Sequence, residues 1–207
     1  GIPNADPQPS QSWLATNEFP VLDLGCGEGS LSRQVFRDVS TTYCGIDLSR
    51  RALRIACRQW PEATWVWANA DRTLPAMDES VDLVISLFGR RPVQEISRVL
   101  RPEARCVIAV PGEEDLMELR SEVQGTVALR NRWKLVVQEM AEGGLEFLEH
   151  HAWKAVVELE AATISDAMAM SYRAFRHSEK DRLERLMETR GQMSVTLSAD
   201  LMLFRKA

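Results

Sequence analysis

The stretch Val21-Leu22-Asp23-Leu24-Gly25-Cys26-Gly27-Glu28-Gly29-Ser30-Leu31 decides the fold of this chain. It passes from apolar residues through an acid into glycines at alternate positions, and then into a pattern typical of a helix. Glycine suits positions that need a positive φ, or where a ligand lies against the main chain with no Cβ between them. We interpret the stretch as a strand, a tight turn and a helix start that form the floor of a site for a nucleotide-like ligand. A plain turn would explain one or two of these glycines, but three of them beside Asp23 and Glu28 favour a ligand.

The composition is that of an ordinary cytoplasmic protein. The chain has 207 residues, of which 45% are hydrophobic and 27% charged, and this fits one domain with an elaboration. No apolar run approaches the ~20 residues of a membrane span, and no secretory signal pattern is present. The formal charge of −5 argues against binding nucleic acid by bulk electrostatics, although local basic faces stay open.

The cysteines and histidines give no metal signature. No Cys-x-x-Cys pair occurs, so we expect neither a zinc module, nor a disulfide framework, nor a bound metal. His150 and His151 lack the companion spacing of a metal site and are interpreted as residues at a strand edge. Residues 1–12 are polar and rich in proline, and we expect them to be disordered, a tag or a linker.

Short apolar segments alternate with amphipathic ones up to residue 110, which predicts a doubly wound, mostly parallel Rossmann-like α/β sheet. After a weak helix at 12–19, the predicted strands are 21–24, 43–47, 65–71, 81–88 and 104–110, and the helices are 30–39, 50–59 and 92–100. Beyond residue 112 we predict a helix at 115–124, strands at 132–140 and 153–159, helices at 165–176 and 179–189, and a strand at 193–204. The last strand would close a seven-stranded sheet through an antiparallel C-terminal hairpin. A single domain is therefore expected at 13–207, with a cofactor-binding half at 13–112 and a substrate-side half at 113–207.

The glycine spacing narrows the ligand. Enzymes that bind nicotinamide or flavin dinucleotides show Gly-x-Gly-x-x-Gly, whereas this chain has Gly25-x-Gly27-x-Gly29 with Ser30 next. Asp23 directly before the turn would repel a pyrophosphate but suits an ammonium group. The pattern therefore points to S-adenosylmethionine, which carries an amino-acid end and a cationic sulfonium.

Acids end the next two predicted strands. Asp47 could accept both ribose hydroxyls, as such a carboxylate does in several nucleotide-binding families; the alternative is that it only satisfies the turn or caps the helix that starts at Arg50. Asp71 could accept the exocyclic amine of adenine. Asn69 is the second candidate for that pocket, because one of the two residues could serve only to cap a turn.

Residues 21–110 resemble the Class I S-adenosylmethionine-dependent methyltransferases. The resemblance rests on the glycine turn, on Asp47, on the Leu74-Pro75 turn and on Val81-Asp82-Leu83-Val84. A narrower resemblance, to the large-subunit (23S) rRNA guanine-N1 methyltransferases, rests on residues 44–49, 108–112, 115–120 and 170–176. It implies S-adenosylmethionine as cofactor. The candidate cofactor-binding residues are Asp23, Gly25, Cys26, Gly27, Gly29, Asp47, Leu48, Asn69, Ala70, Asp71 and Ser86.

Two features depart from that narrower family. Its members that modify rRNA typically begin with a cysteine-rich zinc module, and this sequence contains none. Pro-Gly-Gly, which usually precedes the fifth strand, is replaced by Pro102-Glu103-Ala104. The first departure bears on the RNA substrate, and the second requires the turn to be made differently.

The sulfonium is already activated, so the protein must chiefly align the attack and exclude water. The resemblance implies a ring nitrogen as acceptor, and the sequence shows no obvious base for its proton. The segment 86–92 lacks the Asn/Asp-Pro-Pro-aromatic pattern of enzymes that methylate exocyclic amines. The substrate-side candidates are Phe88, which would stack on a base or lie in the core, Arg90, which with Arg91 would hold a phosphate or be solvated, and Tyr172; no catalytic residue is assigned.

Other features favour structural roles. Arg50, Arg54 and Arg58 follow one another at i, i+4 and i+8, which suits a phosphate backbone but is more typical of an ordinary solvated helix face. Met168, Met170 and Met187 are expected in a core or a flexible lid.

The sequence predicts a methyltransferase with rRNA guanine as its first substrate. The alternatives are a small-molecule acceptor, which the acidic charge favours, and a cofactor-binding or partner-binding protein without turnover. The oligomeric state is not determined by the sequence.

Overall fold

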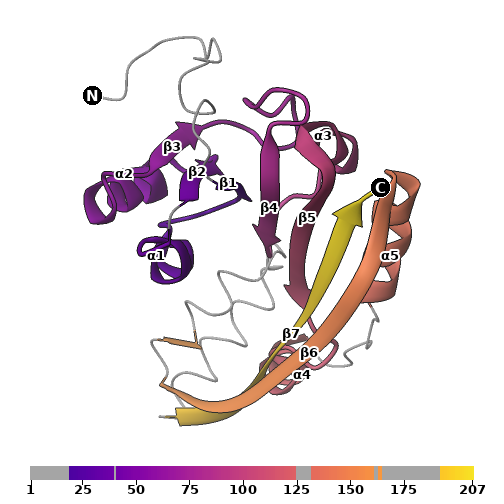
Figure 1. Ribbon diagram of the computed structural model, residues 1–207. Helices are drawn as coiled ribbons and strands as arrows, with labels where there is room; N and C mark the ends of the chain where they lie inside the picture. Colours follow the sequence, from indigo (N-terminus) through magenta and orange to yellow (C-terminus); the bar gives the residue numbers. More distant parts are fainter. Residues whose placement is uncertain (1–18, 40, 125–131, 161–162, 165–191) are drawn as a thin grey trace. The chain divides into compact units, whose positions relative to one another are not determined.

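The computed structural model describes residues 19–39, 41–124, 132–160, 163–164 and 192–207 (Figure 1). These residues fall into two units. Of the described residues, the first unit comprises 19–39, 41–110, 134–150 and 201–207, and the second comprises 111–124, 132–133, 151–160, 163–164 and 192–200. The predicted helices at 12–19, 165–176 and 179–189 lie outside the described residues, apart from Phe19, which begins a strand. The predicted division at residue 112 into a cofactor half and a substrate half stays a prediction.

The first unit is built on parallel strands. The strands are β1 (Phe19–Leu24), β2 (Thr41–Asp47), β3 (Thr64–Trp67), β4 (Val81–Leu87) and β5 (Leu100–Pro111). β1 pairs in parallel with β2 and β4, β2 with β3, and β4 with β5. The near-continuous burial of β1 explains its apolar run, because a parallel strand is covered on both faces.

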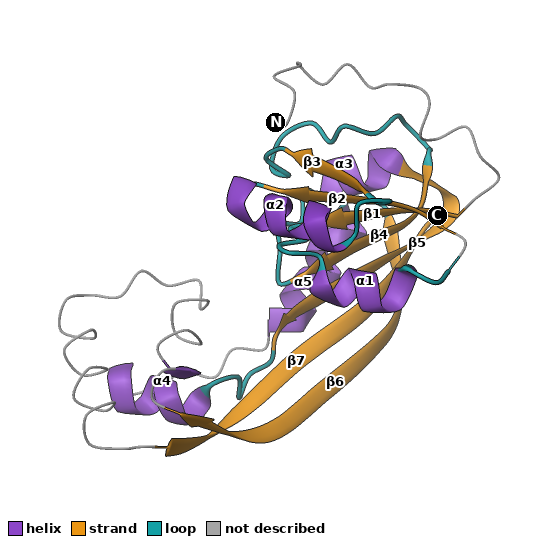
Figure 2. Ribbon diagram, turned by 90° about the vertical axis from the view of Figure 1, so that its left-hand side faces the viewer, coloured by secondary structure: helices purple, strands orange, loops and turns teal. Residues whose placement is uncertain are grey.

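Helices connect these strands. They are α1 (Ser30–Phe36), α2 (Arg50–Gln59) and α3 (Val93–Val99). Figure 2 shows α2 beside β2 and β3, and these elements are in contact. Ser49 caps α2, as its sequence predicts: its side chain accepts a hydrogen bond from the backbone N–H of Ala52 at 3.2 Å.

Two further strands complete the sheet, β6 (Leu145–Glu160) and β7 (Gln192–Lys206). The strand order is β3-β2-β1-β4-β5-β7-β6. The predicted seven-stranded, mostly parallel α/β fold with an antiparallel C-terminal hairpin is therefore confirmed. The predicted strand at 153–159 forms the second half of the longer β6.

The predicted strand at 132–140 is wrong, because these residues form helix α5 (Arg132–Glu142). Val136 and Met140, four residues apart, are buried at 3% and 0% exposure, whereas Leu135 is exposed. Burial at this spacing is that of one helix face. The apolar residues at 133, 135 and 137 resemble strand alternation, but the buried pair belongs to the helical period.

An aromatic cluster fills the first unit beside β2. Tyr43 lies between Trp60 and Trp65, with ring centroids 4.8 and 5.4 Å away. Val21, Ile85 and Phe36 join the same cluster. The indole of Trp65 donates to the carbonyl of Trp60 at 2.9 Å, so its polar group is satisfied.

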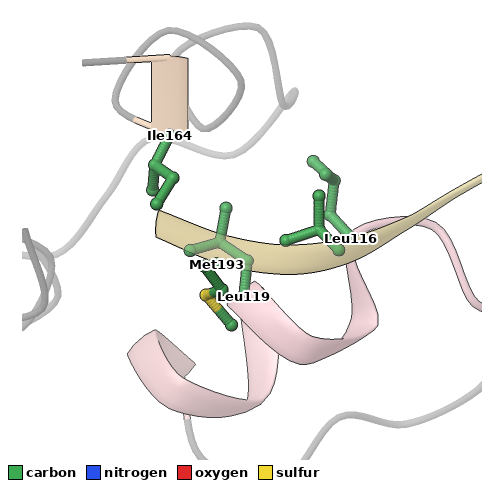
Figure 3. Packing of buried hydrophobic residues seen from close by; sticks show 5 residues of the cluster. Leu116, Leu119, Ile164 and Met193 are labelled. Atoms are coloured by element: carbon green, nitrogen blue, oxygen red, sulfur yellow. The ribbon is translucent and has the colours of Figure 1, made fainter. Parts of the chain in front are cut away.

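The second unit has its own apolar cluster around helix α4 (Met117–Gln124). Leu119, Ile164 and Met193 belong to this cluster of buried side chains (Figure 3). Glu118 fixes this helix to β7, because its carboxylate accepts the N–H and the hydroxyl of Thr196 at 2.8 and 2.6 Å. The helix predicted at 115–124 is confirmed, with a start two residues later.

The turn predicted at Pro102-Glu103-Ala104 does not form, because these residues lie inside β5, where Glu103 has a left-handed backbone with φ of 66°. That conformation costs roughly 1–2 kcal/mol for a residue with a Cβ. The Glu103 carboxylate accepts a hydrogen bond from Arg205 of β7 at 2.9 Å. A strained acidic residue with a specific partner thus stands at the position where the sequence departs from Pro-Gly-Gly.

Candidate functional site

The carboxyl ends of the parallel strands lie at one edge of the sheet, here called the carboxyl edge. In the strand register, Leu24 pairs with Ile46, and Asp47 pairs with Trp67. Asp23 pairs with Ile85, close to the end of β4. The segments that leave β1, β2, β3 and β4 therefore start side by side. These segments and the strand ends before them contain the described residues that the sequence nominates for a site.

The glycine turn after β1 is held by the end of β2. Gly25 N and Cys26 N both donate to the carbonyl of Ile46, at 2.8 and 3.1 Å. Gly25, Gly27 and Gly29 have φ values of 79°, 56° and 67°. These values lie in the left-handed region, so the predicted need for glycine at alternate positions is met in the structure.

The three glycines differ in what surrounds them. A Cβ on Gly29 would lie 2.3 Å from the ring of Trp65, whereas a Cβ on Gly27 would meet nothing within 4 Å. At Gly25 the nearest atom is the Cα of Gly89, at 3.4 Å. Gly29 is therefore required by packing inside the fold, and Gly27 presents the open backbone that a ligand could approach.

Trp65 is a residue that sequence reasoning missed. Its ring also lies 2.7 Å from the Cβ position of Gly45 in β2, so two glycines make room for one indole. The available signal was a large aromatic in a short strand next to a strand that contains glycine. Its ring supports the turn from within the fold.

Asp47 ties the glycine turn to helix α2. Its Oδ2 accepts the N–H of Gly27 at 2.9 Å, and its Oδ1 accepts the N–H of Ser49 at 2.7 Å. The carboxylate thus does satisfy the turn, as the simpler interpretation requires. The residue is half-buried, and each carboxylate oxygen has two lone pairs. A ribose contact therefore stays a prediction that this geometry allows.

Asp23 is the most deeply buried acid of the site, at 3% exposure. Its Oδ2 accepts hydrogen bonds from Ser32 Oγ at 2.5 Å and from Tyr43 OH at 2.6 Å. Burial raises the pKa of this carboxyl above its usual value, and the two hydroxyls only partly offset that effect. One carboxylate oxygen thus joins β1, α1 and β2, while its predicted contact with a ligand ammonium stays a prediction.

Cys26 behaves as a small neutral side chain within the turn. Burial and the nearby acids Asp23 and Asp47 raise the pKa of its thiol well above the usual range. Its Sγ lies 3.8 Å from the carbonyl oxygen of Gly27. Because the thiolate is the reactive form, this cysteine is not poised as a nucleophile.

The turn after β3 separates the roles of its two polar residues. Asn69 Oδ1 accepts the N–H of Asp71 at 2.9 Å, so Asn69 is the residue that caps the turn. The Asp71 carboxylate instead lies 3.2 Å from the Nε of Arg90, in an ion pair whose members are about half exposed. Ala70 between them is buried at 6% exposure. A cofactor candidate and a substrate-side candidate are thus in direct contact.

The segment after β4 is held in place by a hydrogen bond to its backbone and by its close approach to the end of β1. The buried Ser86 donates its hydroxyl to the carbonyl of Arg90 at 2.9 Å. Phe88 has a φ of 62°, and its side chain is 54% exposed, so it is not a core residue. A Cβ on Gly89 would lie 2.4 Å from the carbonyl oxygen of Leu24, which shows how closely this segment approaches the end of β1. Arg91 pairs with Glu139 of α5 at 3.4 Å.

Helix α3 fixes the loop between β3 and β4, a feature that sequence reasoning also missed. Arg98 donates to the carbonyls of Leu74 and Ala76 at 3.1 and 2.9 Å, and it pairs with Asp78 at 2.7 Å. Glu95 accepts the N–H of Leu74 at 2.7 Å. The Arg98 guanidinium holds the pKa of Glu95 below its usual range. The loop that contains Ala70 and Asp71 is therefore attached to a helix.

Some nominated residues fall elsewhere. Tyr172, Met168, Met170 and Met187 lie outside the described residues, and His150 and His151 lie on β6. Within the described ranges, no three potential metal ligands of the His, Cys, Asp and Glu types come together. None of the described helices is long and apolar enough to cross a membrane.

Residues 21–104 match a protein family model described as a methyltransferase domain. The match includes the glycine turn, Asp47, the loop after β3 and strand β4. The expected resemblance to methyltransferases, drawn from the same residues, is confirmed.

Curated relatives modify different substrates. A 23S rRNA (guanine(748)-N(1))-methyltransferase of Streptomyces fradiae is 26% identical over 181 residues, which cover 86% of this chain and 64% of that protein. A demethylmenaquinone methyltransferase of Tropheryma whipplei is 38% identical over 98 residues, which cover 42% of this chain and 40% of that protein. This chain thus spans less than two thirds of the length of either relative.

A solved structure has the same fold. Phosphoethanolamine N-methyltransferase 2 of Haemonchus contortus, in complex with S-adenosyl-L-methionine, superposes with a TM-score of 0.55 and 17% identity. The superposition covers 91% of this chain and 49% of that chain. The Rossmann-like arrangement is therefore shared with a methyltransferase that binds this cofactor.

Replacing Asp23 by Asn should change how stability depends on pH. Because burial raises the pKa of Asp23, the unfolded chain releases this proton first as the pH rises above about 4, and wild-type stability falls over that window. Asn retains an oxygen for Ser32 and Tyr43 but carries no charge. We expect the unfolding free energy of Asp23→Asn, relative to wild type, to increase from about pH 4 to about pH 7 in urea titrations. A difference that is constant or decreasing across this range would contradict the effect of burial.

Proposed function

We propose that this chain is an S-adenosylmethionine-dependent methyltransferase whose acceptor is a guanine ring nitrogen in rRNA. The cofactor part of this proposal rests on the glycine turn. The Gly27 N–H of that turn donates a hydrogen bond to Asp47, the space beside Gly27 is open, and both residues lie in the segment that matches a methyltransferase domain. The acceptor is inferred from the comparison with the rRNA methyltransferase of Streptomyces fradiae, which extends over 86% of this chain.

The groups at the carboxyl edge fit the chemistry of this cofactor. Gly27 leaves open space above its backbone for the methionyl end, and Asp47 offers carboxylate oxygens to the ribose hydroxyls. Ala70 and Asp71 lie on the turn after β3, where an adenine would find an apolar surface and an acceptor for its amine. Leu48, 62% exposed beside Asp47, provides further apolar surface for the same ring.

The bound cofactor supplies an activated methyl group, and the residues of this chain orient the two reactants and exclude water. Phe88 is suited to the acceptor because its exposed ring can stack on a base. Its left-handed backbone and the Ser86–Arg90 hydrogen bond fix the direction of that segment. Arg90 supplies a cation at the same place, paired with Asp71.

A small-molecule acceptor is the second candidate function. The demethylmenaquinone methyltransferase of Tropheryma whipplei has the higher identity, 38%, but its match covers only 42% of this chain. The net charge of −5 also favours a small substrate over a polyanion. The longer match to the rRNA enzyme includes residues outside the shared cofactor-binding segment, and for this reason we rank RNA first.

Gly27→Ala should separate cofactor binding from stability, with Gly144→Ala as its matched control. Both glycines have a positive φ, 56° and 81°, and an added Cβ meets nothing within 4 Å at either. Each variant should therefore lose about 1–2 kcal/mol of stability from the left-handed backbone. We expect only Gly27→Ala to weaken S-adenosylmethionine binding in calorimetry, by on the order of tenfold or more. Equal affinities of the two variants would place the methionyl end away from Gly27.

The acceptor is tested by transfer of labelled methyl groups. Purified protein, labelled S-adenosylmethionine and 23S rRNA without the modification should give label at the N1 position of a guanine, located by nuclease digestion and mass spectrometry. Demethylmenaquinone serves as the competing acceptor in a parallel reaction. Label in the quinone alone would favour the small-molecule function. Cofactor binding without transfer to either acceptor would contradict the rRNA assignment and leave the cofactor assignment standing.

A further inference from the structure

Helix α2 has a row of arginines on its surface. Arg50, Arg54 and Arg58, here called the α2 arginine face, are all exposed. The helix contains no acidic residue. Leu53 and Ala56 are buried, and the helix packs against β2 and β3 (Figure 2). The arginines therefore occupy the part of the helix that the sheet leaves uncovered.

These arginines differ in their partners from five other described arginines. In the described part of the chain, no residue of the α2 arginine face forms an ion pair. Other described arginines do pair with carboxylates, and they are Arg90, Arg91, Arg98, Arg101 and Arg205. In a chain with a formal charge of −5, three unneutralised arginines on one helix are a local excess of positive charge.

The first arginine of the row is held at the carboxyl edge. The guanidinium carbon of Arg50 lies 3.6 Å from the centroid of the Trp67 ring, a cation–π contact. The Trp67 indole donates to the carbonyl of Leu48 at 3.0 Å, next to Asp47. The α2 arginine face thus begins beside the proposed cofactor site. It runs about 12 Å along the helix, at about 1.5 Å for each residue.

We propose that the α2 arginine face binds the phosphate backbone of the RNA substrate. Guanidinium groups match phosphate oxygens in geometry and charge, and they stay protonated at any physiological pH. A row that starts at the carboxyl edge and leads away from it holds the strand on one side of the target base. This inference rests on the proposed RNA acceptor and adds the surface that recognises the RNA. It replaces the interpretation that the sequence pattern favours, in which these arginines form an ordinary solvated helix face.

The double variant Arg54→Gln/Arg58→Gln tests the proposal. Arg50 is left in place because it contacts Trp67. The control is Arg105→Gln/Lys134→Gln, which removes the same charge from two exposed residues outside α2. Binding of a fluorescent single-stranded fragment of 23S rRNA is followed by anisotropy over a range of salt concentrations. S-adenosylmethionine binding is measured on each protein by calorimetry.

Each phosphate contact contributes roughly −0.7 to the slope of log K against log salt for a single strand. We expect the α2 double variant to bind RNA more weakly, with a slope about 1.4 less negative than wild type. The control should retain the wild-type slope, and all three proteins should bind the cofactor equally. Poly-glutamate, tested as a competitor, should displace the RNA poorly.

Three outcomes would overturn the proposal, and they can be told apart. If the α2 variant binds RNA as tightly as wild type and with the same salt dependence, the proposed role of the α2 arginine face is wrong, while the rRNA acceptor is not affected. Wild-type protein that binds no RNA sinks both this surface and the rRNA acceptor. Displacement by poly-glutamate as effective as by RNA, lost in the same variant, makes the face a site for acidic peptides instead.

Discussion

The hydrogen bond from the Gly27 N–H to the Asp47 carboxylate is the interaction on which the proposed site depends. It joins the turn after β1 to the end of β2, while the second oxygen of Asp47 holds the start of α2 through Ser49. The bond is possible because β1 and β2 are parallel and in a register that brings their carboxyl ends together. A turn that contains three left-handed glycines is otherwise free to take many conformations, so this fixed acceptor preorganises the backbone that faces the ligand.

The three acids of the site differ in burial and in structural role. Asp23 is buried, and its Oδ2 is engaged by Ser32 and Tyr43, so much of its role is to hold the elements together. Asp47 is half-buried and binds backbone N–H groups, which leaves lone pairs for a ligand. Asp71 is the most exposed and pairs with Arg90, whose backbone carbonyl is bound by Ser86. Acids nearer the centre of the sheet thus serve the fold, and those farther out are more available for recognition.

Much of this arrangement was predictable because local pattern and final environment agree. The apolar runs at 21–24 and 81–88 are strands buried among parallel neighbours, and Ser49 caps a helix as its type predicts. The failures came from contacts distant in sequence. Residues 132–140 look like a strand until the buried faces of Val136 and Met140 select a helix. That Gly29 is needed to make room for Trp65 was not foreseen, and its contact with a ligand stays a prediction. The hydrogen bonds from Arg98 to the carbonyls of Leu74 and Ala76 depend on a loop conformation that no local pattern encodes.

A crystal structure of the protein with S-adenosylmethionine bound tests the central claim most directly. The claim predicts the methionyl end against the backbone of Gly27, the ribose hydroxyls within hydrogen-bond distance of Asp47, and the adenine beside Ala70 with its amine toward Asp71. Density for the cofactor at any other place, or crystals that bind none at millimolar concentration, would contradict it.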